Sequence, residues 1–131
     1  MNDLIIKICG MREQAELDCA AALGVDLCGF IFAPQSPRAV TPEQAAALDS
    51  GDMLRVGVFV TDDMRFIEET SRAARLERIQ RHGYQPMTSA DRLSRTLGAE
   101  RLIRVLWPER YPDLAALEET MNRHAASTGM F

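Results

Sequence analysis

The chain has 131 residues, which is enough for one domain, and we predict a single domain over residues 1–131. Hydrophobic residues make up 47% and charged residues 26%, the usual balance of a globular protein, which argues against extended disorder. The 15 Lys and Arg residues against 19 Asp and Glu give a net charge of -4 without a basic cluster. This charge pattern argues against nucleic acid as a partner, since phosphate binding needs a positive face.

The cysteines and the chain start give expectations about compartment. Cys9, Cys19 and Cys28 match no zinc-ligand spacing, and we predict reduced thiols and no metal site. The first nine residues have no cleavage site of a secretory signal, and no run approaches the ~20 apolar residues of a membrane span. We therefore expect a cytoplasmic protein that does not bind membranes.

Short β-branched runs alternate five times with longer stretches of helical period. The predicted strands are residues 4–9, 27–32, 55–60, 78–82 and 101–106. The predicted helices are residues 12–23, a helix that begins at Thr41, residues 62–74, a helix from Thr88 or Ser89 to 97, and residues 113–126. Thr41 is the clearest start, because Pro42 suits a first turn and Gln44 completes a capping box. Residues 129–131 predict the first step of a sixth strand.

The strands recur at similar intervals with one helix between each pair, which is typical of βαβ units around a parallel sheet. Right-handed crossovers place every strand-to-helix loop at one end of such a sheet. An open doubly wound sheet and a (β/α)8 barrel both fit this rhythm, and five units are fewer than a barrel contains. Periodicity alone leaves the two architectures open.

The end of the first predicted strand is the first candidate site. Side chains alternate along a strand, so Lys7 and Cys9 share one face. An ammonium beside a thiol near a helix start favours the thiolate, the form that acts as a base or nucleophile. The alternative is a small buried cysteine with Lys7 extending to solvent.

Two further strand ends carry polar side chains. Arg38 follows Ser36 and Pro37 in the loop after the second strand, where its planar guanidinium could bind a carboxylate or phosphate. Gln80 and His82 project together from the end of the fourth strand. A solvated loop arginine and a structural histidine are the alternatives.

Five segments taken together resemble one family, phosphoribosylanthranilate isomerase. They are residues 7–10 (K-I-C-G), 29–32 (G-F-I-F), 36–38 (S-P-R), 56–59 (V-G-V-F) and 80–83 (Q-R-H-G). The family pattern is K-I-C-G, G-F-x-F followed by S-P-R, V-G-V-F, and Q-L-H-G, in this order and at about these distances. The resemblance covers the whole chain and implies the (β/α)8 TIM-barrel fold, incomplete here, with about five βα units and the start of strand six.

The resemblance implies an isomerase of tryptophan biosynthesis. Its reaction converts N-(5-phosphoribosyl)anthranilate to 1-(2-carboxyphenylamino)-1-deoxyribulose 5-phosphate by an Amadori rearrangement, without a metal or organic cofactor. By resemblance Cys9 is the catalytic base, Arg38 lies near the anthranilate carboxylate, and the rim of the pocket is formed by Gln80 and His82. Arg81 replaces the family's leucine, and its side chain must find a partner or reach solvent on the helix side.

The family keeps its general acid, an aspartate at the end of strand six, and its phosphate-binding loops in a part that has no counterpart here. Asp113 cannot substitute, because it begins the fifth predicted helix. We therefore expect the 131-residue chain to be a truncated isomerase that turns over substrate poorly or not at all. Open edges of the sheet would also allow it to self-associate.

Two non-catalytic readings stay open, a half-barrel that pairs with itself and a flavodoxin-like α/β binding module. The flavodoxin-like module predicts helices on both faces of the sheet, and a barrel segment predicts helices on one face only. Indole-glycerol-phosphate synthase, another ribose-phosphate barrel, does not combine K-I-C-G with S-P-R.

Overall fold

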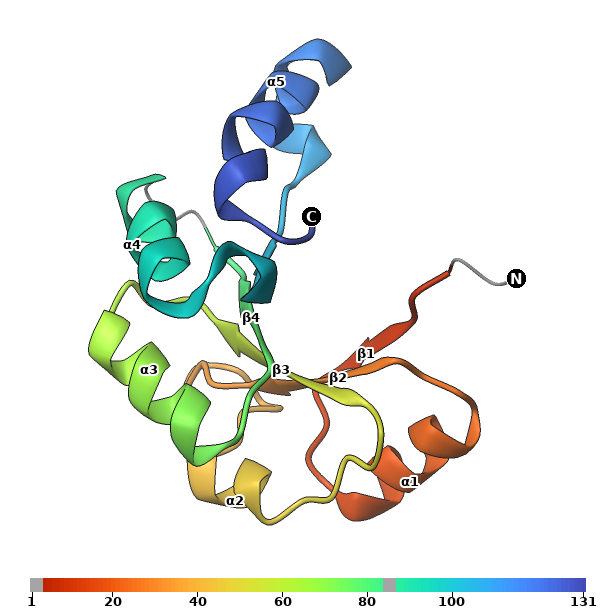
Figure 1. Cartoon of the computed structure of the whole chain (residues 1–131). Helices are drawn as coiled ribbons and strands as arrows, with labels where there is room; N and C mark the ends of the chain where they lie inside the picture. Colours follow the sequence, from red (N-terminus) through yellow and green to blue (C-terminus); the bar gives the residue numbers. More distant parts are fainter. Residues whose placement is uncertain (1–3, 84–86) are drawn as a thin grey trace.

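A single parallel sheet organises the chain (Figure 1), and the computed structural model describes residues 4–83 and 87–131. The five strands lie in the order in which they occur in the sequence, β1-β2-β3-β4-β5. This order differs from that of a doubly wound sheet, in which the strand order reverses at a switch point. The strands are β1 (Lys7–Cys9), β2 (Leu27–Ile31), β3 (Leu54–Phe59), β4 (Arg78–Arg81) and β5 (Leu102–Arg104).

One α-helix lies between each pair of successive strands, and another follows β5, as the sequence predicts. The helices are α1 (Gln14–Ala22), α2 (Pro42–Ala46), α3 (Met64–Ala73), α4 (Met87–Leu97) and α5 (Leu114–His124). The capping box at α2 is confirmed: Thr41 Oγ1 accepts from the Gln44 N–H at 3.1 Å, and Gln44 Oε1 accepts from the Thr41 N–H at 2.9 Å. The predicted cap of α4 at Thr88 or Ser89 is wrong, because α4 already begins at Met87. Hydroxyl residues also occur within first turns, so they mark a helix start only to within a residue or two.

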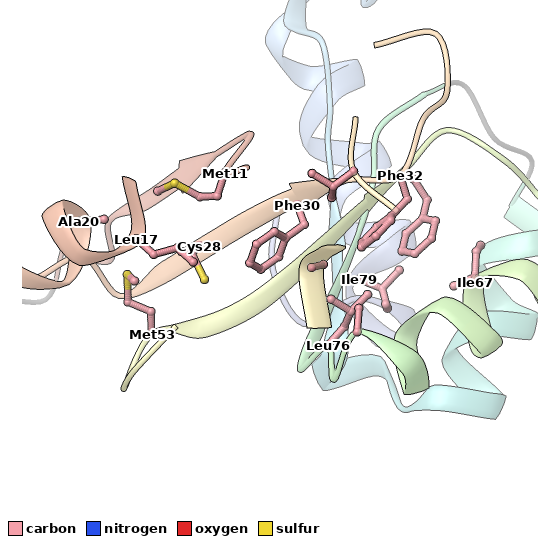
Figure 2. Close-up of a cluster of buried hydrophobic side chains, with 14 of the residues drawn as sticks. Met11, Leu17, Ala20, Cys28, Phe30, Phe32, Met53, Ile67, Leu76 and Ile79 are labelled. Atoms are coloured by element: carbon pink, nitrogen blue, oxygen red, sulfur yellow. The ribbon is translucent and has the colours of Figure 1, made fainter. Parts of the chain in front are cut away.

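The helices cover one face of the sheet, here called the outer face. Cys28, Phe30 and Ile79 point from the strands into a core that also contains Leu17 of α1 and Ile67 of α3 (Figure 2). Leu93 of α4 belongs to the same core, and Figure 1 shows α1 to α4 along the same side of the sheet. A flavodoxin-like module would need a second helical layer, so this arrangement is that of a barrel segment.

The opposite face, here called the inner face, carries the alternate residues of each strand. Leu27, Val56 and Ile103 pack there as a second buried cluster, joined by Leu54 and Met130. Met130 pairs with Ile103 as an isolated parallel bridge, and its N–H donates to the Leu102 carbonyl at 3.2 Å. The predicted first step of a sixth strand is therefore confirmed next to β5.

Arg55 and Arg81 are both buried on the outer face, with very different surroundings. Arg55 donates to the carbonyls of Ala45, Leu48 and Ala74, and so ties the ends of α2 and α3 to β3. Its guanidinium also lies 4.6 Å from the Phe30 ring centroid, and burial lowers its pKa.

Arg81 finds an ion-pair partner rather than solvent. It is 4% exposed, and its Nη2 lies 3.6 Å from Asp62 Oδ1, beyond hydrogen-bond distance. Its Nε and Nη2 make no hydrogen bond within the described part of the chain. Burial, together with the nearby charge of Arg104, lowers the pKa of Arg81 to about 10.

Candidate active site

Cys9 and Lys7 lie together at the carboxyl end of β1. Cys9 pairs with Gly29 of β2, and Lys7 pairs with Leu27. A Cβ built on Gly29 would lie 3.0 Å from Cys9 Sγ and 3.3 Å from Lys7 Nζ. The thiol and the ammonium therefore lie side by side over the Gly29 backbone, and the missing side chain of Gly29 makes room for both. The predicted common face of Lys7 and Cys9 is confirmed.

Arg38 lies against the turn that follows Cys9. Its Nη1 donates to the Cys9 carbonyl at 3.2 Å. Gly10 has a φ of 85°, a left-handed conformation that favours glycine, and a Cβ there would lie only 2.7 Å from Arg38 Cζ. Gly10 thus allows both the turn and the close approach of the guanidinium. Two sequence-predicted residues, Cys9 at the end of β1 and Arg38 in the loop after β2, are therefore in direct contact.

Arg12 and Glu16 reinforce this contact, and sequence reasoning missed both. Arg12 Nη1 donates to the Pro37 carbonyl at 3.0 Å. Glu16 Oε2 accepts from the N–H groups of Arg12 at 2.6 Å and Glu13 at 3.0 Å, and these bonds lower the pKa of Glu16. The signal in the sequence was a glutamate three residues after Glu13 at a helix start.

Gln80 and His82 lie at the same end of the sheet on β4. Gln80 pairs with Val58 and Ile103 and is half-buried on the inner face. His82 follows β4 by one residue, its N–H donates to the Phe59 carbonyl at 2.8 Å, and its ring is exposed. By strand alternation His82 also points to the inner face.

The His82 ring packs edge-to-face on Trp107, with ring centroids 5.4 Å apart. Arg110 Cζ lies 4.2 Å from the Trp107 centroid. Trp107 follows β5, so this cluster occupies the ends of β4 and β5. Two strands, β2 and β3, separate it from Cys9. The structure thus brings Cys9 and Arg38 into contact and places Gln80 and His82 further along the same end.

Several other features bear on what the site can do. Asp113 caps α5, where its Oδ1 accepts from the Ala116 N–H at 2.8 Å, so it lies away from the strand ends. A hollow of about 340 Å³ touches Cys9 and Arg38 but also Cys19 of α1 and Leu23, the residue after α1, and so lies along the β1 edge. Residues 4–83 and 87–131 contain no cluster of His, Cys, Asp and Glu that could hold a metal ion. Within the same ranges no helix has the length and apolar character required to cross a membrane.

Comparisons with known proteins agree with the motifs at the strand ends. The family described as N-(5'phosphoribosyl)anthranilate (PRA) isomerase matches residues 6–124. The N-(5'-phosphoribosyl)anthranilate isomerase of Desulfovibrio desulfuricans is 49% identical over 122 residues, covering 93% of this chain and 56% of the relative. That of Maridesulfovibrio salexigens is 34% identical over 120 residues, covering 92% and 57%. The chain therefore spans a little over half the length of these relatives.

Solved structures show the same fold. Phosphoribosyl anthranilate isomerase from Thermotoga maritima matches with a TM-score of 0.79 at 24% identity, over 93% of this chain and 58% of that chain. A phosphoribosyl anthranilate isomerase in complex with reduced 1-(o-carboxyphenylamino)-1-deoxyribulose 5-phosphate matches with a TM-score of 0.75 at 26% identity, over 93% and 61%. The open five-stranded sheet corresponds to an incomplete (β/α)8 barrel of this kind. The chain belongs to the N-(5'-phosphoribosyl)anthranilate isomerase family.

Proposed function

We propose that residues 1–131 form the part of an N-(5-phosphoribosyl)anthranilate isomerase that supplies its catalytic base, Cys9. The observation that carries the proposal is the contact at the end of β1, where Arg38 Nη1 lies 3.2 Å from the Cys9 carbonyl. The Cys9 thiol lies over Gly29 beside Lys7, on the face of the sheet that the helices leave open. The product is 1-(2-carboxyphenylamino)-1-deoxyribulose 5-phosphate, an intermediate of tryptophan biosynthesis.

The reaction needs proton transfers and no external oxidant or reductant. An acid protonates the furanose ring oxygen, the C1–O bond breaks, and the nitrogen lone pair forms a protonated Schiff base. Cys9, as the base, then removes the C2 proton; the C–H electron pair forms the C1=C2 bond, and the C=N pair returns to nitrogen. The enolamine takes up a proton at C1 and loses one from the C2 hydroxyl to give the ketone. C1 is reduced, C2 is oxidised, and the sum is an isomerisation.

Arg38 is proposed to bind the anthranilate carboxylate. Its Nη1 is held by the Cys9 carbonyl, and its Nε and Nη2 make no hydrogen bond to the residues that the structure describes. Nε and Nη2 form one edge of the guanidinium, which can pair with a carboxylate through two parallel bonds. Gln80 and His82 are proposed to line the rim of the same pocket from β4.

The general acid and the phosphate site are proposed to come from outside these residues, as the resemblance implies. We further propose that residues 1–131 form one partial barrel domain, that the protein works in the cytoplasm without nucleic acid or membrane partners, and that its open edge can self-associate. Ile6, just before β1, and Ile8, within β1, are 40% and 41% exposed, and these apolar side chains at the edge of the sheet support self-association.

The test compares the 131-residue chain with a fusion in which the C-terminal two-fifths of the Desulfovibrio desulfuricans relative follows Phe131. Turnover is measured from the fluorescence of the anthranilate group. We expect the fusion to be active, Cys9→Ala to lower its turnover by at least about a hundredfold because the base is lost, and Cys19→Ala to leave it unchanged. Cys19 is a matched control, since it is an exposed cysteine on α1. Full activity in the Cys9→Ala fusion would show that another group is the base.

A further inference from the structure

Two arginines connect the loops after β1 and β2 in opposite directions. Arg12 extends from the first loop to the Pro37 carbonyl, and Arg38 extends from the second loop back to the Cys9 carbonyl. The two bonds span 25 and 29 residues of sequence. We call this pair of contacts the arginine clasp.

The Arg12 contact acts on the peptide group that begins Arg38. The Pro37 carbonyl and the Arg38 N–H belong to one planar peptide unit. Arg12 Nη1 donates to the oxygen of this unit at 3.0 Å, and Ser36 Oγ accepts from its N–H at 3.2 Å. Hydrogen bonds at its carbonyl and at its N–H therefore fix the plane of the Pro37–Arg38 peptide unit, from which the Arg38 side chain extends.

Arg12 is itself held in place from α1. Its main-chain N–H donates to Glu16 Oε2 at 2.6 Å, which fixes the backbone at the start of the helix. The Glu16 carboxylate also attracts the charges of Arg12 and Arg38, since both contribute to its lowered pKa. A negative charge that attracts two guanidinium groups offsets part of their mutual repulsion.

We propose that Arg12 is a positioning residue, which holds Arg38 in the orientation that receives the substrate carboxylate. The inference rests on the proposed function of Arg38. Arg12 acts through the Pro37–Arg38 peptide and is not itself required to touch substrate. Removing it leaves the Arg38 charge in place but allows the peptide plane and the guanidinium to rotate.

The first experiment observes Arg38 in the 131-residue chain by NMR, through the rate of rotation about its Nε–Cζ bond. The signal is assigned by its disappearance in Arg38→Lys. We expect rotation to be at least several-fold faster in Arg12→Ala, and to return toward the native rate in Arg12→Lys, whose ammonium can still donate to Pro37. The matched control is Arg65→Ala on α3, which removes an exposed arginine and should leave the Arg38 signal unchanged.

The second experiment titrates the fusion described above with the reduced product analogue and with an aniline counterpart that lacks the carboxylate. We expect Arg12→Ala to weaken binding of the carboxylate ligand about fivefold, the loss of one hydrogen bond, and to leave the counterpart unchanged. An unchanged Arg38 rotation rate, or equal weakening of both ligands, would overturn the positioning role. If the unsubstituted fusion binds neither ligand while Arg38 still responds to Arg12→Ala in the 131-residue chain, the clasp stands and the proposed function fails.

Discussion

Replacing Arg81 with leucine tests whether the outer face of β4 carries an electrostatic cost that the family pattern avoids. Arg81 is 4% exposed, and its ion pair with Asp62 at 3.6 Å is too long for a hydrogen bond. Its neighbour across the sheet is a second cation, Arg104. The pKa of Arg81 is lowered from its ordinary value to about 10, because burial disfavours the charged form.

The pKa shift sets the scale of the effect. At 1.36 kcal/mol per pKa unit, keeping Arg81 charged in the fold costs roughly 3 kcal/mol. Leucine removes this cost but leaves a small cavity, and the cavity lowers the free energy of unfolding by about 1 to 2 kcal/mol. Loss of the ion pair with Asp62 has little effect on stability, since the Asp62 side chain is 49% exposed and stays hydrated. We expect Arg81→Leu to stabilise the fold by about 1 to 2 kcal/mol, within the range seen when buried ionic groups are replaced by apolar ones.

Urea unfolding of the 131-residue chain, followed by circular dichroism, measures the effect. Arg55→Leu is the matched control, since it removes a guanidinium that is equally buried but well bonded. It removes the Arg55 hydrogen bonds to the carbonyls of Ala45, Leu48 and Ala74 and should destabilise the fold by about 3 to 5 kcal/mol. If Arg81→Leu destabilised the fold as much as Arg55→Leu, the argument from unsatisfied burial would be wrong.

Two further predictions concern the inner face and the end of α5. Gly29→Ala places a Cβ 3.0 Å from Cys9 Sγ and 3.3 Å from Lys7 Nζ. We therefore expect the free energy of unfolding to fall by about 1 kcal/mol and the alkylation rate of Cys9 to change. If both the stability and the alkylation rate were unchanged, the close packing over Gly29 would be wrong. The His124 side chain is 3% exposed, and Arg104 Nη1 lies 3.3 Å from its Nδ1. Burial and, to a lesser extent, the charge of Arg104 lower the pKa of His124. The unfolded chain therefore binds the proton first, so urea titrations should show stability falling as the pH drops below about 6.5, and His124→Gln should flatten this dependence. A native profile that matches the variant would rule out the buried neutral imidazole.

Local patterns predicted the elements and the faces of the strands. The capping box at Thr41 and the shared face of Lys7 and Cys9 depend on neighbours within a few residues, and the structure confirms both. The rhythm of strands and helices predicted parallel βαβ units, and five strands pair in that way. The motifs also predicted that Cys9, Arg38 and His82 surround one pocket. Arg38 contacts the Cys9 carbonyl, and His82 lies at the same end of the sheet but is separated from Cys9 by β2 and β3.

The hydrophobic periodicity of the sequence does not predict which distant segments contact each other. It left open whether helices cover one face of the sheet or two, and the choice follows from how α1 to α4 pack on the strands. The same holds for the surroundings of Arg81, since a buried arginine and a solvated one look alike in sequence.

The sequence by itself determined the order of the elements, the parallel sheet and the residues at the strand ends, because these follow from hydrophobic period, turn chemistry and motif. The tertiary structure alone decided which guanidinium groups are bonded. Arg55 donates hydrogen bonds to carbonyls at helix ends, and Arg12 donates one to the Pro37 carbonyl, 25 residues away in the sequence. Arg81 forms only an ion pair with the Asp62 carboxylate among the described residues. The physical reason is that a backbone carbonyl is present at every residue, and only the folded chain brings a particular one within 3 Å of a particular donor.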